Sequence, residues 1–102
     1  MKQVVFHVEA EKELIASAEY YENRQTHLGT RFLLSIQESI AHIILNPRIY
    51  QKCLDEIRKC RVHTFPYGII YEEFPDRIVI YAIVHLKRKP GYWKKRLPPP
   101  GQ

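Results

Sequence analysis

Residues 78–84 read Ile-Val-Ile-Tyr-Ala-Ile-Val, the longest uninterrupted apolar run in a chain of 102 residues. β-Branched and aromatic side chains of this kind favour an extended strand. Because both faces of the strand are apolar, we expect it to lie at the centre of a sheet, with helices packed on one face. The strand is predicted to run from Arg77 to His85.

Two segments upstream show the alternation of period two that is typical of strands, residues 57–64 and residues 67–74. The second is joined to the central strand by the compact turn Pro75-Asp76, and the two are joined to each other near Phe65-Pro66. Such short connections pair strands antiparallel. The second half of the chain therefore predicts a three-strand antiparallel meander.

The first half of the chain predicts a short strand followed by two helices. The alternation in residues 4–8 predicts a strand that ends near Glu9. Two apolar stripes with helical spacing follow, separated by the polar residues 23–29. The stripes consist of Ala10, Leu14, Ala18 and Tyr21 in the first helix and of Phe32, Ile36, Ile40 and Ile43 in the second. Pro47 ends the second helix, because proline cannot donate to the helical ladder, so an antiparallel helix hairpin is predicted.

These elements predict one α+β domain of two layers, a helix hairpin on a mainly antiparallel sheet. We expect the domain to span residues 1–97, followed by a flexible proline-rich end at residues 98–102. No apolar run is long enough to cross a membrane, and the first residues do not have the pattern of a signal peptide. Cys53 and Cys60 lack the spacing of zinc ligands and are expected to be reduced thiols, so a cytoplasmic protein is predicted.

The net charge of +5 is unevenly distributed along the chain. Residues 1–51 carry a net charge of −1, whereas residues 52–102 carry +6. From Arg77 onward there are seven basic side chains and no acidic one. This distribution favours a polyanion or a strongly acidic protein as the partner of the second half.

The sheet face away from the helices is the predicted functional site, because a domain of this size has no further layer to cover it. In residues 57–64, alternation sends Lys59, Arg61 and His63 to this open face. In the central strand, the same alternation assigns Ile78, Ile80, Ala82 and Val84 to the helix side and leaves Val79, Tyr81, Ile83 and His85 on the open side. Two histidines, two basic side chains and a tyrosine are thus expected to lie close together on the open face.

Such a set suits phosphodiester cleavage without a metal. His85 or Tyr81 would exchange protons with the reacting oxygens, while Lys59 and Arg61 would stabilise charge on phosphorus. The alternative is a solvated strand face, which is about as common for alternating charges, with His63 a plain surface histidine. The chain has no glycine-rich phosphate loop, HExxH or GxSxG motif, and neither a cofactor nor a metal is predicted.

Basic and aromatic residues are interleaved after the central strand. Lys87-Arg88-Lys89 and Lys94-Lys95-Arg96 bracket Tyr92-Trp93, a composition typical of contacts to a nucleic-acid backbone. The residues predicted to bind a nucleic acid or another target are Arg58, His63, Lys87, Arg88, Tyr92, Trp93 and Arg96. The alternative is that Trp93 folds back on the sheet edge and leaves its basic neighbours in water.

Six short motifs follow one another along nearly the whole chain. They are Ala10-Glu11-Lys12-Glu13-Leu14 with Tyr20-Tyr21, Leu28-Gly29-x-x-Phe32, Asn46-Pro47, Ile57-Arg58-Lys59, Phe65-Pro66-Tyr67 with Tyr71, and His85-x-x-Arg88-x-Pro90-x-x-Trp93-x-x-Arg96. In this order and spacing they resemble the RelE/ParE family of type II toxins. The resemblance implies a growth-inhibiting toxin, often linked to plasmid stabilization, and a cognate antitoxin whose acidic, disordered segment folds onto it.

The resemblance implies three alternative activities. In the ribonuclease branch of the family, basic, His and Tyr residues on the open sheet face cut mRNA on the ribosome, and Lys59, Arg61 and His85 fit this branch loosely. The ParE branch poisons DNA gyrase and lacks that catalytic set. A degenerate toxin would only bind its antitoxin. The preferred prediction is a metal-independent mRNA endonuclease in which His85, Arg61, Lys59 and Tyr81 are catalytic, with gyrase poisoning as the alternative.

Overall fold

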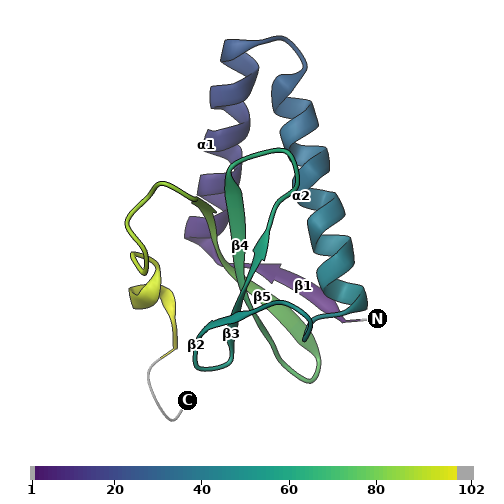
Figure 1. Cartoon of the computed structure of the whole chain (residues 1–102), viewed down its shortest axis with the longest axis vertical. Helices are drawn as coiled ribbons and strands as arrows, with labels where there is room; N and C mark the ends of the chain where they lie inside the picture. Colours follow the sequence, from purple (N-terminus) through teal and green to yellow (C-terminus); the bar gives the residue numbers. More distant parts are fainter. Residues whose placement is uncertain (1, 99–102) are drawn as a thin grey trace.

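The computed structural model describes residues 2–98, in which two helices lie against one face of a five-stranded sheet (Figure 1). In chain order the elements are β1 (Gln3–Phe6), α1 (Val8–Arg24), α2 (Leu28–Leu45), β2 (Lys52–Leu54), β3 (Ile57–Arg61), β4 (Tyr67–Glu73), β5 (Arg77–His85) and the short 3-10 helix η1 (Lys94–Arg96). The predicted α+β fold with a helix hairpin and a meander is confirmed. No helix within residues 2–98 is long and apolar enough to span a membrane.

The strands are arranged in the order β1-β5-β4-β3-β2. β5 therefore lies inside the sheet, as its apolar sequence predicts, parallel to β1 and antiparallel to β4, which occupies the middle position. β2, a three-residue edge strand that pairs antiparallel with β3, was not predicted. A strand this short has too few residues to show a periodicity. β3 is shorter than predicted and ends at Arg61, because Thr64 has a positive φ of 78° where the chain turns.

The helix hairpin begins and turns at positions that differ slightly from the prediction. β1 ends at Phe6 rather than near Glu9, because His7 caps α1: its Nδ1 accepts a hydrogen bond from the Glu9 N–H at 3.0 Å. Gly29 belongs to the first turn of α2, not to the connection. A Cβ on Gly29 would lie 2.5 Å from the Ala18 carbonyl oxygen, so glycine lets the two helices approach closely.

The core between the helices and the sheet is rich in aromatic rings. Phe32 of α2 is completely buried, and its ring lies 5.2 Å from that of Phe65 and 4.9 Å from that of Tyr67. Tyr21 of α1 completes the cluster, at 5.3 Å from Phe32. Ile40, predicted to lie in the core, is only partly buried and packs at its edge. The two apolar stripes thus meet the sheet as predicted.

A β-bulge in β5 changes which side chains face the helices. Tyr71 lies opposite Ile80 and Ile70 lies opposite Ala82, so Tyr81 is an extra residue in β5. The alternation shifts by one from that point. Ile83 therefore packs in the helix-side core, whereas Ala82 packs in the cluster on the opposite face. The predicted assignments of Ala82, Ile83 and Val84 are wrong, because they assume a strand without a bulge.

The sheet face away from the helices is not open. The chain after β5, residues 86–98, which we call the C-terminal segment, folds back over it (yellow in Figure 1). Trp93 is only 6% exposed and packs in one cluster with Ile57, Ile70, Tyr81, Ala82 and Val84. The alternative in which Trp93 folds back on the sheet is therefore correct for Trp93 itself, but not for its neighbour Arg96, whose side chain is largely buried rather than in water. The predicted flexible end at residues 98–102 lies, apart from Pro98, outside the described residues.

Candidate functional site

Lys59 and Arg61, two of the four predicted catalytic residues, lie on β3 with exposed side chains. Lys59 is opposite Ile70 and Arg61 is opposite Gly68. Ile70 packs in the cluster with Trp93, so both basic side chains are on the face away from the helices, as predicted. Their catalytic role stays a prediction.

Tyr81 points to the same face but is not available to a substrate. Its side chain is 3% exposed, and its hydroxyl donates a hydrogen bond of 2.9 Å to Glu72 Oε1. Burial raises the pKa of Tyr81 well above its ordinary value, and the Glu72 carboxylate raises it further. The phenol is therefore protonated and hydrogen-bonded to Glu72, which indicates a structural role.

His85 ends β5, and its ring lies on the helix side of the sheet. The ring packs edge-on against that of Tyr67, a core residue, at 5.1 Å, and its Nδ1 accepts from the Lys87 N–H at 3.1 Å. His85 borders both a groove beside Tyr20 and Arg24 and the edge of the opposite face. The prediction that its side chain shares the face of Lys59 is wrong, because the bulge at Tyr81 reverses the direction of the following side chains.

Arg58 and His63, both predicted to bind a target, differ in exposure. Arg58 is half-buried, and its Nη1 donates to the Tyr50 carbonyl oxygen at 2.7 Å, so it holds the chain that precedes β2. His63 is exposed in the turn between β3 and β4, where its carbonyl oxygen accepts from Ser35 Oγ at 2.8 Å. Of these two residues, only His63 has a side chain that is exposed to a partner.

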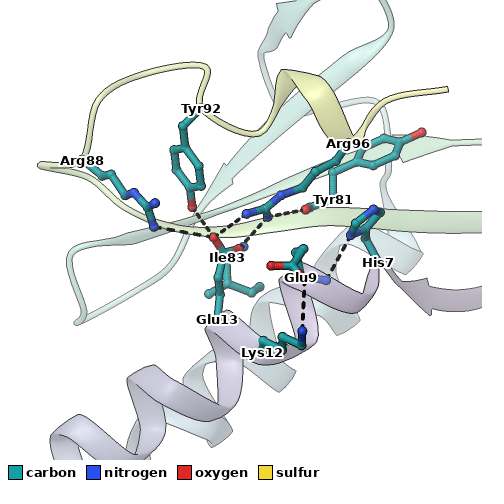
Figure 2. Close-up of polar contacts among 9 residues, drawn as sticks. All are labelled: His7, Glu9, Lys12, Glu13, Tyr81, Ile83, Arg88, Tyr92 and Arg96. Atoms are coloured by element: carbon teal, nitrogen blue, oxygen red, sulfur yellow. Dashed lines mark hydrogen bonds and ion pairs between the residues drawn. The ribbon is translucent and has the colours of Figure 1, made fainter. Parts of the chain in front are cut away.

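The C-terminal segment is held to α1 by one carboxylate (Figure 2). Glu13 accepts two hydrogen bonds from the Arg96 guanidinium, at 2.8 and 2.9 Å, and one from the Tyr92 hydroxyl at 2.6 Å. It also accepts from the Ile83 N–H at 3.1 Å, while Arg96 donates to the Tyr81 carbonyl oxygen at 2.9 Å. We call Glu13, Ile83, Tyr92 and Arg96 the Glu13 clasp.

The electrostatics of the clasp keep Glu13 ionised. Burial raises the pKa of Glu13, but the hydrogen bonds from Arg96, Tyr92 and Ile83 outweigh it, so its pKa lies below the ordinary value. Arg88 adds a second cation, 3.8 Å from the carboxylate and 3.8 Å from the centre of the Tyr92 ring. Three residues predicted to bind a target, Arg88, Tyr92 and Arg96, are therefore engaged in internal contacts.

Glu13 itself was missed by the sequence analysis as a residue of special importance. It lies off the apolar stripe of α1, as do the exposed Glu9 and Glu11, and the sequence pattern alone does not separate these carboxylates. The sequence held only a weak indication of this role. Buried basic side chains need an acidic partner, and every acidic residue of the chain precedes the basic C-terminal run.

A cleft of about 220 Å³ opens between the sheet and the C-terminal segment. Its lining is basic at the rim and apolar at the floor, and we call it the basic cleft: Cys53, Lys59, Ile70, Val84, His85, Leu86, Arg88, Lys89, Pro90, Gly91, Tyr92, Trp93 and Lys94. Burial raises the pKa of the Cys53 thiol above its ordinary value, although the nearby charges of Lys59 and Lys94 oppose this shift.

Two glycines make room for the lysines of the basic cleft. A Cβ on Gly68 of β4 would lie 2.9 Å from Lys59 Cε, and a Cβ on Gly91 would lie 2.9 Å from Lys94 Cε. Gly91 also has a φ of 81°, which L-residues with side chains rarely adopt. Each lysine stem therefore lies over a position without a side chain, which directs the ammonium groups along the surface of the cleft.

The chain is similar to known toxins. A family model described as the ParE toxin of the type II toxin-antitoxin system, parDE, matches residues 4–90. A solved structure described as the chromosomal ParDE TA system from P. aeruginosa has 13% sequence identity and a TM-score of 0.62, covering 85% of this chain and 98% of that chain. At this identity the likeness shows the fold alone. No curated protein matches the chain.

Proposed function

This chain belongs to the ParE toxin family of type II toxin-antitoxin systems, which implies an antitoxin partner, and we propose from this premise that it inhibits growth without catalysis. Its target is DNA gyrase, and a cognate antitoxin with an acidic segment neutralises it. The net charge of +6 in residues 52–102 supports an acidic partner, because complementary charge accelerates association.

One observation carries the choice of a non-catalytic mechanism: two of the four side chains expected to cut RNA are held in internal contacts, although one of these, His85, borders the basic cleft that Lys59 lines. Lys59 and Arg61 are exposed on one face, the Tyr81 hydroxyl is buried against Glu72, and the His85 ring packs on Tyr67 at the helix side. General acid-base catalysis requires a proton donor or acceptor within hydrogen-bond reach of the reacting atom. Tyr81 therefore cannot donate a proton to, or accept one from, a phosphate ester held by Lys59 and Arg61.

Ribosome-dependent mRNA cleavage is the second candidate. The exposed pair Lys59 and Arg61 favours it, since two cations two residues apart on a strand can stabilise charge on a phosphate. His63 is the exposed histidine next to this pair in sequence. In this alternative a histidine would transfer the proton, and its loss would lower the rate by a factor of about 10² to 10⁴.

The experiment is induced expression of the wild type and His85→Gln in a bacterial host without the antitoxin, with growth, plasmid supercoiling and transcript 5′ ends measured together. We expect both proteins to stop growth at equal expression and to leave relaxed or cleaved plasmid DNA. His63→Gln is tested in parallel, because it removes the exposed histidine that is next to the basic pair in sequence. Ribosome-phased mRNA ends that disappear with either variant would contradict the proposal and support the nuclease.

A further inference from the structure

Cations and acids are segregated on this molecule. Within residues 2–98, Glu13 forms ion pairs with Arg88 and Arg96, and Glu73 forms ion pairs with Lys2 and Arg48. None of the ion pairs in this part of the chain involves Lys59, Arg61, Lys89 or Lys94. Other basic side chains also form no ion pair, but these four line two adjoining depressions where β3 meets the C-terminal segment.

These four side chains form a row along the surface, which we call the track: Lys59, Arg61, Lys89 and Lys94. Lys59, Lys89 and Lys94 line the basic cleft. Arg61 lines an adjoining depression, which shares Cys53, Lys59 and Leu86 with the cleft. Lys59 and Arg61, two residues apart on one strand face, are about 6.6 Å apart along the strand. A row of positive charges at this spacing matches an anion whose charges also repeat.

We propose that the basic cleft and the adjoining Arg61 bind backbone phosphates of DNA, so that the toxin contacts DNA as well as protein in its target complex. The choice of DNA over other polyanions rests on the proposed function. Lysine recognises phosphate as a point charge, so the three lysines of the cleft can contact successive phosphates without a fixed orientation. The aromatic residues do not read bases: Trp93 is buried in the cluster beneath the cleft, and Arg88 covers the Tyr92 ring.

This arrangement makes binding independent of DNA sequence. Phosphate contacts fix the position of a protein on DNA but carry no sequence information. Four cations that each displace a condensed counterion give a slope of log Kobs against log salt of about −3 to −4. The Glu13 clasp positions Lys89 and Lys94 in this account, because it fixes the segment that carries them.

The test is fluorescence anisotropy of two fluorescein-labelled DNA duplexes of unrelated sequence, titrated with the purified full chain at several salt concentrations. We expect equal affinity for both duplexes. Lys59→Gln and Lys94→Gln should each weaken binding and reduce the salt slope by about 1. Lys59→Arg should retain the wild-type slope. Lys12→Gln is the control, since it removes the same charge from an exposed position on α1.

Three outcomes would overturn the inference. One is a loss of affinity that is the same for Lys12→Gln as for Lys59→Gln, which would mean that net charge alone matters. Another is displacement of the duplex by a poly-glutamate peptide at lower concentration than by unlabelled DNA, which would identify the track as a surface for an acidic peptide. The third is much tighter binding of an RNA of the same sequence. The plasmid supercoiling experiment is independent, so loss of DNA binding with retained gyrase poisoning would reject only this inference.

Discussion

The two faces of the sheet are covered in different ways. On one face, two helices bury a continuous apolar core that includes Phe32, Ile36 and Tyr67. On the other, a single segment of irregular chain buries Trp93 and is held by the Glu13 clasp. The first layer depends on apolar area spread over many residues, whereas the second depends on a few polar contacts. The second layer should therefore open at lower free energy than the first.

The largest effect is expected in the helix-covered layer. Phe32→Ala removes a completely buried ring that contacts Tyr21, Phe65 and Tyr67, and should lower the free energy of unfolding by about 3 to 5 kcal/mol. Urea denaturation followed by far-UV circular dichroism measures it. Leu34→Ala on the same helix is the control, because Leu34 is 58% exposed. Equal midpoints for the two variants would show that this layer does not dominate stability.

The C-terminal layer should respond more weakly and more locally. Glu13→Gln keeps the shape of the side chain but replaces its charge-assisted hydrogen bonds with neutral ones, and should destabilise the docked segment by about 2 kcal/mol. Trp93 is the only tryptophan, so its fluorescence reports this layer alone. In the variant we expect the fluorescence midpoint in urea to fall below the midpoint from circular dichroism.

Glu11→Gln is the control for this change, since Glu11 is exposed on the same helix and none of the ion pairs within residues 2–98 involves it. Coincident midpoints in Glu13→Gln would mean that both layers unfold together and that the comparison between them fails.

Acid should weaken the same contact. The folded-state pKa of Glu13 lies below its ordinary value of 4.5, so its contribution to stability is fully present above about pH 5 and is lost as the pH falls below 4.5. The difference in stability between the wild type and Glu13→Gln should be constant from pH 7 to pH 5 and shrink at lower pH. Urea midpoints from Trp93 fluorescence measure it. Because Glu73 and Glu22 have lowered pKa values as well, only the difference curve isolates Glu13. A difference that does not shrink at all as the pH falls below 4.5 would contradict the assignment.

The smallest effect is expected at the bulge. Tyr81→Phe removes one hydrogen bond to Glu72 and should lower the free energy of unfolding by about 1 kcal/mol, while growth inhibition stays at the wild-type level. Val79→Ala, two residues earlier on β5 and half-buried on the same face, is the control for stability. If the Tyr81→Phe protein folds normally but no longer inhibits growth, the result would support the predicted catalytic role of Tyr81.

Sequence patterns predicted the helix-covered layer well, because periodicity reports a buried face directly. The stripes of α1 and α2 and the apolar run of β5 each mark residues that pack in the core. Pro47 marks the end of α2, and the turn at Pro75-Asp76 marks the start of β5. The placement of His85 failed for a physical reason. One inserted residue at Tyr81 reverses every later side chain of the strand, and no pattern of apolar residues marks the bulge, since β5 is apolar on both faces.

The sequence by itself determined the α+β class, the helix hairpin, the interior position of β5 and the concentration of positive charge in the second half. These properties depend on residue types and local spacing. Only the tertiary structure decided that Glu13 meets Arg96 across 83 positions of the chain, and that the C-terminal segment covers the second face. A contact between residues far apart in sequence depends on the direction of both backbones. That direction is set by packing and by the bulge, which the pattern of residue types does not encode.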